Sequence, residues 1–387
     1  SVGKPLVMVA RRLSCTGEPG ARCLDSKMEG AMKVKAAINV DLSGSLVIDD
    51  LDIGDPGPTH VIVKQFATGV CHSQLHQMHN PALPRPLVLG HESTGVVMAR
   101  GREVTHVNEG DHVMLTWVQR DRFEYTPDPT PWHATYQGKQ VRHGDRSPTG
   151  VFTWAETIIA DQQYVVKLTE PDVPTDVTSI VGCAVMTGCG AVVNSAHVRP
   201  GQSVAVIGAG GVGLCAIQAA YNLGAHPIIV VDLSDEKLAF AQKFGASIGI
   251  NAAREDAVAR ILEITQGGAD FVFDAIGLGK TTEQMLAATR PGVNGLKDGG
   301  TAVLVGVPHG DRPMINPRDM FVGKIFRGAP GGSCRPDRDL PMFVRWFREG
   351  RLPLDQLVTR RYTLDQINDA CTALAHGEIE GRAIVVF

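Results

Sequence analysis

The sequence has no apolar run long enough to form a membrane-spanning helix. Such a helix needs roughly 18 to 20 consecutive apolar residues. The longest apolar runs among the 387 residues are short pieces such as residues 227–231 and 383–387. We therefore expect neither an integral membrane protein nor a membrane partner.

An excess of charge of one sign is also missing. The chain carries 37 Lys and Arg against 41 Asp and Glu, and its formal net charge is −4. Its basic side chains are scattered among acids, whereas nucleic-acid binders gather them on one face, so we expect no nucleic-acid partner. Hydrophobic residues make up 43% of the chain. That is enough for a large folded core and, at this length, for two domains.

Closely spaced cysteines are absent as well. The eight cysteines are widely and irregularly spaced, unlike the disulfide framework of a small secreted protein. The first thirty residues lack the apolar core of a secretory signal. These features favour a reducing compartment, and we expect a cytoplasmic protein whose residues 1–31 form a poorly ordered extension.

Two patterns follow each other along the rest of the chain. Between residues 32 and 184, Gly and Pro interrupt short runs of β-forming residues, which is typical of a mostly antiparallel β domain. A polar, proline-containing stretch over residues 119–150 is predicted to be a long surface loop. From residue 203 onward, apolar strands alternate with helical periodicity, which predicts a doubly wound parallel α/β sheet. Its expected strands are residues 203–207, 227–231, 248–251, 271–274 and 301–305, and its expected helices are residues 211–223, 235–244, 254–266 and 281–289.

A glycine-rich turn follows the first strand of this second region. Gly208, Gly210 and Gly213 fit the pattern G-x-G-x-x-G. These glycines permit a tight turn, a close approach of backbone to a pyrophosphate, and packing of helix on strand. Asp232 ends the next strand, where a carboxylate would accept from both ribose hydroxyls and repel a 2′-phosphate. The motif predicts NAD rather than NADP, against the alternative of a glycine-rich turn that binds nothing.

Two thiols, one imidazole and one carboxylate occur beside glycine-marked turns. Cys71, His91 and Cys183 are ligand types that Zn²⁺ prefers, and three protein ligands leave the fourth tetrahedral position open for water or substrate. Glu92 follows His91 directly. The alternative interpretation is structural, with the cysteines as small buried hydrophobes and His91 as a core residue.

The residues around His91 resemble the zinc-containing alcohol dehydrogenases of the medium-chain dehydrogenase/reductase superfamily. Residues 90–95, Gly-His-Glu-Ser-Thr-Gly, followed by Gly101 and Val104, fit that family's signature G-H-E-x-x-G-x5-G-x-x-V at every fixed position. The segments that begin at Cys71 and at Gly182 resemble those that carry the first and third zinc ligands. The resemblance extends over residues 32–387.

The resemblance implies a division into two domains. Residues 32–184 together with 332–387 would form a GroES-like catalytic domain, and residues 185–331 a Rossmann NAD-binding domain. It also implies a homo-oligomer, either a dimer or a tetramer.

The resemblance further implies roles for individual residues. Ser73 would accept the proton of the substrate alcohol, and His76 would receive it by way of the cofactor ribose and release it to water. Glu92 would be a carboxylate able to approach the metal. The implied zinc ligands are Cys71, His91 and Cys183; the implied cofactor contacts are His72, Thr187, Gly208, Gly210, Gly211, Val212, Gly213, Asp232, Lys237, Val307 and Arg382; and the implied substrate pocket contains Ser73, Trp117 and Val307.

The chain departs from the family pattern at two points. It has no cysteine between Cys71 and Cys183, so we expect it to lack the four-cysteine structural zinc site of the long family members and to bind one catalytic zinc. Gln74 stands where the family commonly has an acid that orients the ligand histidine. Its amide oxygen can still accept a hydrogen bond from an imidazole.

These features predict a zinc-dependent, NAD-linked dehydrogenase that reversibly oxidises a primary or secondary alcohol. Zinc would act as a Lewis acid on the substrate oxygen while hydride passes to the nicotinamide. One alternative is a glutathione-adduct or polyol dehydrogenase of the same superfamily, which differs only in its pocket residues. The other is a non-catalytic nucleotide-binding relative, which the intact ligand set disfavours.

Overall fold

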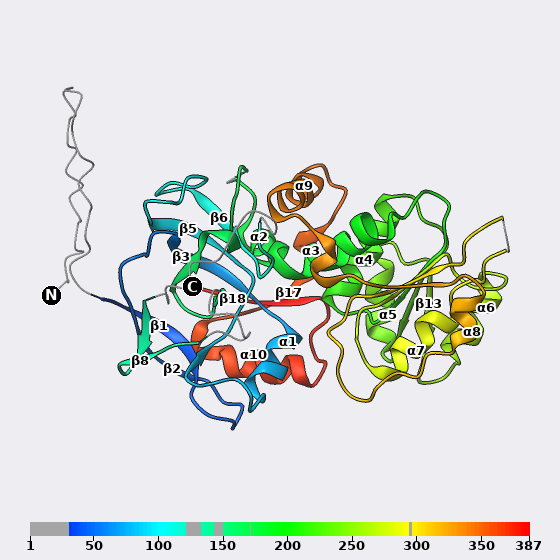
Figure 1. The fold of residues 1–387 in the computed structure, drawn as a ribbon, viewed down its shortest axis with the longest axis horizontal. Coiled ribbons are helices and arrows are strands. Elements are labelled where there is room, and N and C mark those ends of the chain that lie inside the picture. The colour runs from blue at the N-terminus through cyan, green and yellow to red at the C-terminus, as the bar shows by residue number, and fades with distance from the viewer. Residues whose placement is uncertain (1–30, 121–132, 143–149, 171, 294–295) are drawn as a thin grey trace.

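The computed structural model describes residues 31–120, 133–142, 150–170, 172–293 and 296–387. The chain forms two lobes joined by helices (Figure 1). The predicted extension therefore lies outside the described residues apart from its last position, and so does much of the predicted loop over residues 119–150. The mixed α/β fold predicted from the sequence is confirmed.

The first lobe contains two β-sheets. One has the strand order β4-β1-β2-β7-β8, and the other has the order β10-β6-β5-β3-β18-β17 with β9 also paired to β3. Their strands pair antiparallel, except that β17 and β18 run parallel. The strands are β1 (Met32–Asn39), β2 (Val47–Ile53), β3 (His60–Val70), β4 (Leu87–Val88), β5 (Ser93–Arg100), β6 (His112–Leu115), β7 (Ala134–Tyr136), β8 (Lys139–Gln140), β9 (Thr157–Asp161), β10 (Val165–Lys167), β17 (Val358–Tyr362) and β18 (Arg382–Val386).

The pairing of β1 with β2 shows how alternation sets the register. Successive side chains of a strand point to opposite faces of the sheet. On the inner face, Val34 lies opposite Leu51 and both are buried in the core. On the outer face Lys35 lies opposite Asp50, and the two charges are 2.7 Å apart. A shift of one residue would bury the lysines, so this register is strongly specified.

The prediction of a loop over residues 119–150 is wrong for its described middle part. Strands β7 and β8 form a hairpin there and extend the first sheet beside β2. The two turn residues, Gln137 and Gly138, have φ values of 51° and 73°. Two positive φ angles give the turn a twist that matches the twist of the flanking strands.

A long buried helix, which is not among the elements predicted from the sequence, joins the lobes. It runs over Thr175–Ala196 through α2 (Thr175–Ile180), η2 (Val181–Val185), α3 (Met186–Gly190) and η3 (Ala191–Ala196). Its 22 residues are long and apolar enough to cross a membrane, but 89% of its most apolar window is buried inside the protein. It is thus the core helix at the junction of the lobes. The predicted domain boundary between residues 184 and 185 falls inside it.

The second lobe is the predicted doubly wound sheet. Its strands all run parallel in the order β13-β12-β11-β14-β15-β16, with the order reversing between β11 and β14. Ligands bind at the carboxyl ends of strands beside such a switch point. The strands are β11 (Val204–Ile207), β12 (Ile228–Asp232), β13 (Ile248–Asn251), β14 (Phe271–Asp274), β15 (Thr301–Leu304) and β16 (Ile325–Gly328), and the helices are α4 (Gly211–Asn222), α5 (Asp235–Gln242), α6 (Ala257–Ile264), α7 (Gly279–Ala287) and α8 (Pro317–Phe321).

The last part of the chain returns to the first lobe. Strand β18, in red in Figure 1, pairs antiparallel with β3. Helix α9 contacts the long helix, and α10 contacts α1. These helices are α1 (His72–Met78), α9 (Pro336–Arg348) and α10 (Ile367–Ala375), and the short 3₁₀ turns are η1 (Gln162–Tyr164), η4 (Pro330–Ser333), η5 (Leu354–Leu357) and η6 (Leu364–Gln366).

Candidate metal centre and cofactor cleft

A cleft of about 960 Å³ collects residues from both lobes. Its walls include the start of α1, the middle of the long helix, the glycine-rich turn and the segment after β15. Glu92 and Gly213 are buried outside its lining. Of the predicted site residues, the cleft is lined by Cys71, His72, Ser73, His76, His91, Trp117, Cys183, Thr187, Gly208, Gly210, Gly211, Val212, Asp232, Lys237, Val307 and Arg382.

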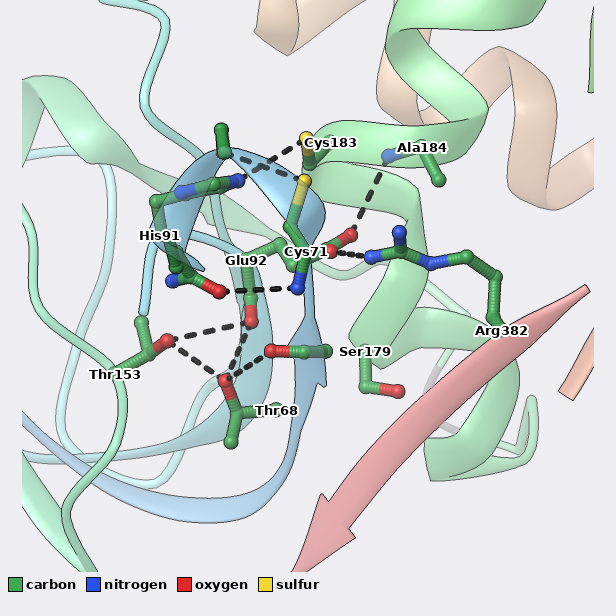
Figure 2. Close-up of polar contacts among 12 residues, drawn as sticks. Thr68, Cys71, His91, Glu92, Thr153, Ser179, Cys183, Ala184 and Arg382 are labelled. Carbon is green, nitrogen blue, oxygen red and sulfur yellow. Dashed lines mark hydrogen bonds and ion pairs between the residues drawn. The ribbon is translucent and has the colours of Figure 1, made fainter. Parts of the chain in front are cut away.

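The three predicted zinc ligands converge at one wall of this cleft (Figure 2). Cys71 follows β3, Cys183 lies in the long helix, and His91 follows Gly90. Together with Glu92, their ligand atoms all lie within 4.8 Å of one another, and His91 Nε2 is 3.2 Å from Cys183 Sγ. Two thiols and an imidazole suit Zn²⁺. Within the described part of the chain, this is the one such group of three or more potential ligands.

The turn before His91 requires a glycine. Gly90 has a φ of +91°, and a Cβ there would lie 2.2 Å from Thr153 Oγ1 and 2.8 Å from Trp154 N. Any other residue would therefore displace the backbone that carries His91.

Helix α1 holds Cys71 at its N-terminal end. The backbone N–H of Cys71 donates to Gln74 Oε1 at 3.0 Å, and Ser73 Oγ donates to Cys71 Sγ at 3.4 Å. Gln74 thus uses its amide oxygen to cap this helix. From the sequence we expect only that this oxygen is able to accept a hydrogen bond from an imidazole.

The two thiols share their protons unequally. The hydrogen bond with Cys183, helped by His91, lowers the pKa of Cys71 well below its ordinary value despite burial. The same bond and burial raise the pKa of Cys183, although the Trp117 indole and the Thr187 hydroxyl act in the opposite direction. Zinc binds cysteine as the thiolate, so a metal ion at this pair would displace the thiol protons.

A buried ion pair connects this centre to the cofactor side of the cleft. Glu92 is fully buried; its Oε2 accepts from Ala184 N at 3.3 Å, and its Oε1 forms an ion pair with Arg382 (Figure 2). The Arg382 stem lies against the glycine-rich turn, since a Cβ on Gly211 would be 2.2 Å from Arg382 Cδ. Arg382 Nε is buried and has no partner among the described residues. It is therefore available to a bound group.

The glycine-rich turn is built as its motif predicts. Gly208 has a φ of +99°, and a Cβ on Gly213 would lie 1.9 Å from Gly208 O. A Cβ on Gly210 would meet open space, so this position leaves the turn open towards the cleft. Helix α4 begins directly after it, and its free N–H groups attract an anion.

Asp232 holds the same turn from the neighbouring strand. Its Oδ2 accepts from Ala209 N at 2.8 Å, and its Oδ1 accepts from Leu233 N at 2.8 Å and Ser234 N at 3.1 Å. The carboxylate lines the cleft while fixing the backbone of the turn. The sequence predicts its contact with the ribose but not these hydrogen bonds to the turn.

Trp117 lies in the cleft wall rather than in the core. Its side chain is 38% exposed and interacts with the Cys183 sulfur. The turn η4 lies beside it: a Cβ on Gly331 would be 3.5 Å from Trp117 Cζ2. This turn was not among the predicted elements, although Pro330, Gly331 and Gly332 are typical turn residues.

His309 is a further cleft residue, and it is not among the residues predicted from the sequence. It lines the cleft, and its ring contacts that of His76. It lies a few residues beyond the carboxyl end of a predicted parallel strand, where ligand-binding loops lie in such sheets. This position relative to the strand was the feature of the sequence that could have indicated a cleft residue.

Comparisons with known proteins agree with this geometry. A family model described as zinc-binding dehydrogenase matches residues 211–349, and one described as alcohol dehydrogenase GroES-like domain matches residues 57–170. Geraniol dehydrogenase from Castellaniella defragrans is 31% identical and covers 90% of this chain and 96% of its own length. S-(hydroxymethyl)glutathione dehydrogenase from Paracoccus denitrificans is 30% identical and covers 92% of this chain and 100% of its own length.

A solved structure agrees over nearly the whole chain. Benzyl alcohol dehydrogenase from Acinetobacter calcoaceticus superposes with a TM-score of 0.81 at 30% identity, and covers 92% of this chain and 99% of its own. The chain is an oxidoreductase and belongs, as the sequence resemblance predicted, to the zinc-containing alcohol dehydrogenase family of the medium-chain dehydrogenase/reductase superfamily.

Proposed function

We propose that this chain reversibly oxidises an uncharged, largely apolar alcohol with NAD, using one zinc ion held by Cys71, His91 and Cys183. Zinc supplies a Lewis acid when bound, and the nicotinamide supplies a hydride acceptor. The observation that carries the proposal is the opening of the donor cluster and the glycine-rich turn onto one cleft. Substrate oxidation at the metal and binding of the cofactor can therefore take place in the same cleft.

The donor set fits a zinc ion with an open position. Three protein ligands of soft and borderline character suit catalytic zinc. Glu92 is held by Arg382 and by the backbone of Ala184. We assign Glu92 a supporting role beside the metal. Its carboxylate would approach the metal only if Arg382 moved.

The opposite wall fits a dinucleotide. Gly208, Gly210, Gly211 and Gly213 would give the pyrophosphate a close backbone approach at the start of α4. Asp232 would accept from the ribose, and the unpartnered Arg382 Nε is a donor for an anion. The remaining proposed cofactor contacts all line the cleft: His72, Thr187, Val212, Lys237 and Val307.

Two residues of α1 are proposed to move the proton. Ser73 and His76 are three positions apart, so they share a helix face, and both line the cleft. Ser73 would take the proton of the alcohol at Oγ, and the His76 imidazole would release it towards solvent.

The substrate end of the cleft favours an alcohol without charge. Trp117 and Val307 contribute apolar surface there, and among the described lining residues the permanent cations are Lys237 and Arg382. Lys237 lies on α5 beyond Asp232, and Arg382 is paired with Glu92. Both are proposed cofactor contacts, so neither is left for the carboxylates of a glutathione adduct. An aromatic or other apolar alcohol suits the indole better.

A substrate panel tests this proposal. We expect kcat/KM to be highest for benzyl alcohol, lower for sorbitol and lowest for S-(hydroxymethyl)glutathione, with NADH formation followed by absorbance. Trp117→Leu should lower the value for benzyl alcohol more than that for sorbitol, because only the aromatic substrate loses a ring contact. Preference for the glutathione adduct would contradict the proposed substrate class.

A second copy of the chain is the proposed partner. Strand β16 pairs with β15 along one edge only among the described residues, and an open edge strand favours pairing with another chain. Exposed apolar side chains precede it, with Met314 84% and Phe321 88% exposed. We propose a homo-oligomer formed across this edge. Phe321→Lys should shift the sedimentation coefficient towards the monomer, and an unchanged value would contradict it.

We also propose domain limits and a cellular location for this chain. We keep residues 32–184 with 332–387 as the catalytic domain and 185–331 as the NAD-binding domain. The pairing of β18 with β3 supports the return of the chain to the first of these. The six described cysteines are free thiols, which supports a reducing, cytoplasmic location.

A further inference from the structure

Two imidazoles from different lobes meet at the cleft. His76 lies on α1, and His309 lies on the segment that follows β15. Their ring centroids are 4.8 Å apart with planes inclined at 48°. Both line the cleft. The contact therefore joins the proposed proton-releasing residue to a second ionisable group that the proposed function has not used.

The hydrogen bonds of His309 fix its tautomer. Its Nδ1 lies 2.8 Å from Val307 O. A carbonyl oxygen only accepts, so Nδ1 carries the hydrogen and the neutral ring leaves Nε2 as a free acceptor. The backbone N–H of His309 also donates to Gly277 O at 3.0 Å. The ring is thus anchored to the end of the parallel sheet with one nitrogen ready to take a proton.

The surroundings of His76 favour passing a proton on. Burial lowers the pKa of His76, and the neighbouring His309 and His72 lower it further, while the Cys71 sulfur acts in the opposite direction. Helix α10, which also packs on α1, presents the apolar Leu374 and Ala375 to the cleft. On the segment of His309, the nearest ionisable residue in sequence is Asp311.

We propose that His309 is a proton-relay residue that receives a proton from His76. The rings are in contact but not hydrogen-bonded to each other, so a water molecule carries the proton between them: an N–H bond of the His76 ring breaks, the water accepts that proton and gives up another, an N–H bond forms at His309 Nε2, and no electrons are gained or lost. Water or a buffer base then takes the proton from His309. The inference rests on the proposed function, because alcohol oxidation is what releases the proton.

The first test measures the two rings without substrate. We compare the NMR titrations of the His76 and His309 ring protons in the wild-type chain, in His309→Gln and in His79→Gln. His79 caps the same helix but does not line the cleft, so it is the matched control. Coupled rings cannot both be charged easily. His309→Gln should therefore shift the His76 titration to higher pH, whereas His79→Gln should not.

The second test measures alcohol oxidation in weak buffer below neutral pH. His309→Gln should be about 10-fold slower, less than the 10²- to 10⁴-fold of a whole acid–base step, because water still reaches His76. Added imidazole buffer should restore the rate, and adding His309→Gln to His76→Gln should slow it no further. Zinc content and NADH affinity should not change.

Two results separate the inference from the proposed function. If the wild-type chain oxidises alcohols but His309→Gln matches His79→Gln in both tests, only the role of His309 is overturned. If the wild-type chain oxidises no alcohol, the proposed function fails, and with it the relay.

Discussion

Asp232 is predicted to control both the affinity for NAD and the discrimination against NADP. Its carboxylate accepts three backbone hydrogen bonds, from Ala209, Leu233 and Ser234. A carboxylate has about four lone-pair sites, so about one remains for a ribose hydroxyl. That is one fewer than the two hydroxyls expected from the sequence.

The size of the effect follows from this single remaining bond. A hydrogen bond to a charged group contributes about 1.5 to 3 kcal/mol, and about 1.4 kcal/mol changes a dissociation constant tenfold. Asp232→Asn removes the charge and one acceptor oxygen. We therefore expect NADH to bind about 10- to 150-fold more weakly. NADPH should gain relative to NADH, because the carboxylate no longer repels its 2′-phosphate.

Fluorescence titration with NADH and NADPH measures both effects. Asp235→Asn is the matched control, since Asp235 is an exposed acid at the start of α5 that does not line the cleft. Zinc content should be equal in all samples. Equal affinity of the wild-type chain for both cofactors would refute the reasoning. So would an unchanged NADH-to-NADPH ratio in Asp232→Asn.

Four further predictions test the metal, the proton and the ion pair. Metal analysis of zinc-repleted protein should give about one zinc per chain; two would show that a second site exists. Cys183→Ala should lose zinc and turnover but keep NADH affinity, because the ligand and the glycine-rich turn belong to different elements; retained activity would remove zinc from the account. Ser73→Ala should lower kcat by about 10²- to 10⁴-fold with metal content unchanged, and a near-normal rate would assign the proton to another group. Arg382→Met should lower the free energy of unfolding by about 3 to 5 kcal/mol, because it leaves Glu92 buried and unpaired; urea unfolding should show partial recovery when Glu92→Gln is added, and an unchanged single variant would contradict the buried pair.

The parallel sheet was predictable because each of its strands has a recognisable local sequence pattern. Strands β13 and β14 have the predicted bounds. Short apolar runs between polar loops are typical of strands buried on both faces. The glycine-rich turn was equally clear, since its three glycines and Asp232 have positions fixed by one strand–turn–helix unit.

The long helix was not predictable in the same way. It is buried on most sides, so it has no polar stripe that would reveal a period of 3.6 residues. Gly182, Gly188 and Gly190 also interrupt its apolar run. They are there because other backbones pass close by: a Cβ on Gly182 would lie 1.9 Å from Leu115 O. Packing, which the sequence does not display, explains both features.

Contacts between distant segments define the rest of the site. The ligand residues were recognisable from a family signature, yet the pairing of Glu92 with Arg382 and the contact of His76 with His309 join opposite parts of the chain. The first depends on the return of β18 to the first lobe, and the second on how the two lobes meet at the cleft. No local sequence pattern indicates either contact.

Metal removal tests the central proposal, zinc-dependent alcohol oxidation, most directly. The protein is treated with a chelator, and NADH formation from benzyl alcohol is measured before and after zinc is restored. We predict that activity disappears with the metal and returns in proportion to added zinc, reaching its maximum at about one equivalent per chain. Full activity in verified metal-free protein would contradict the account.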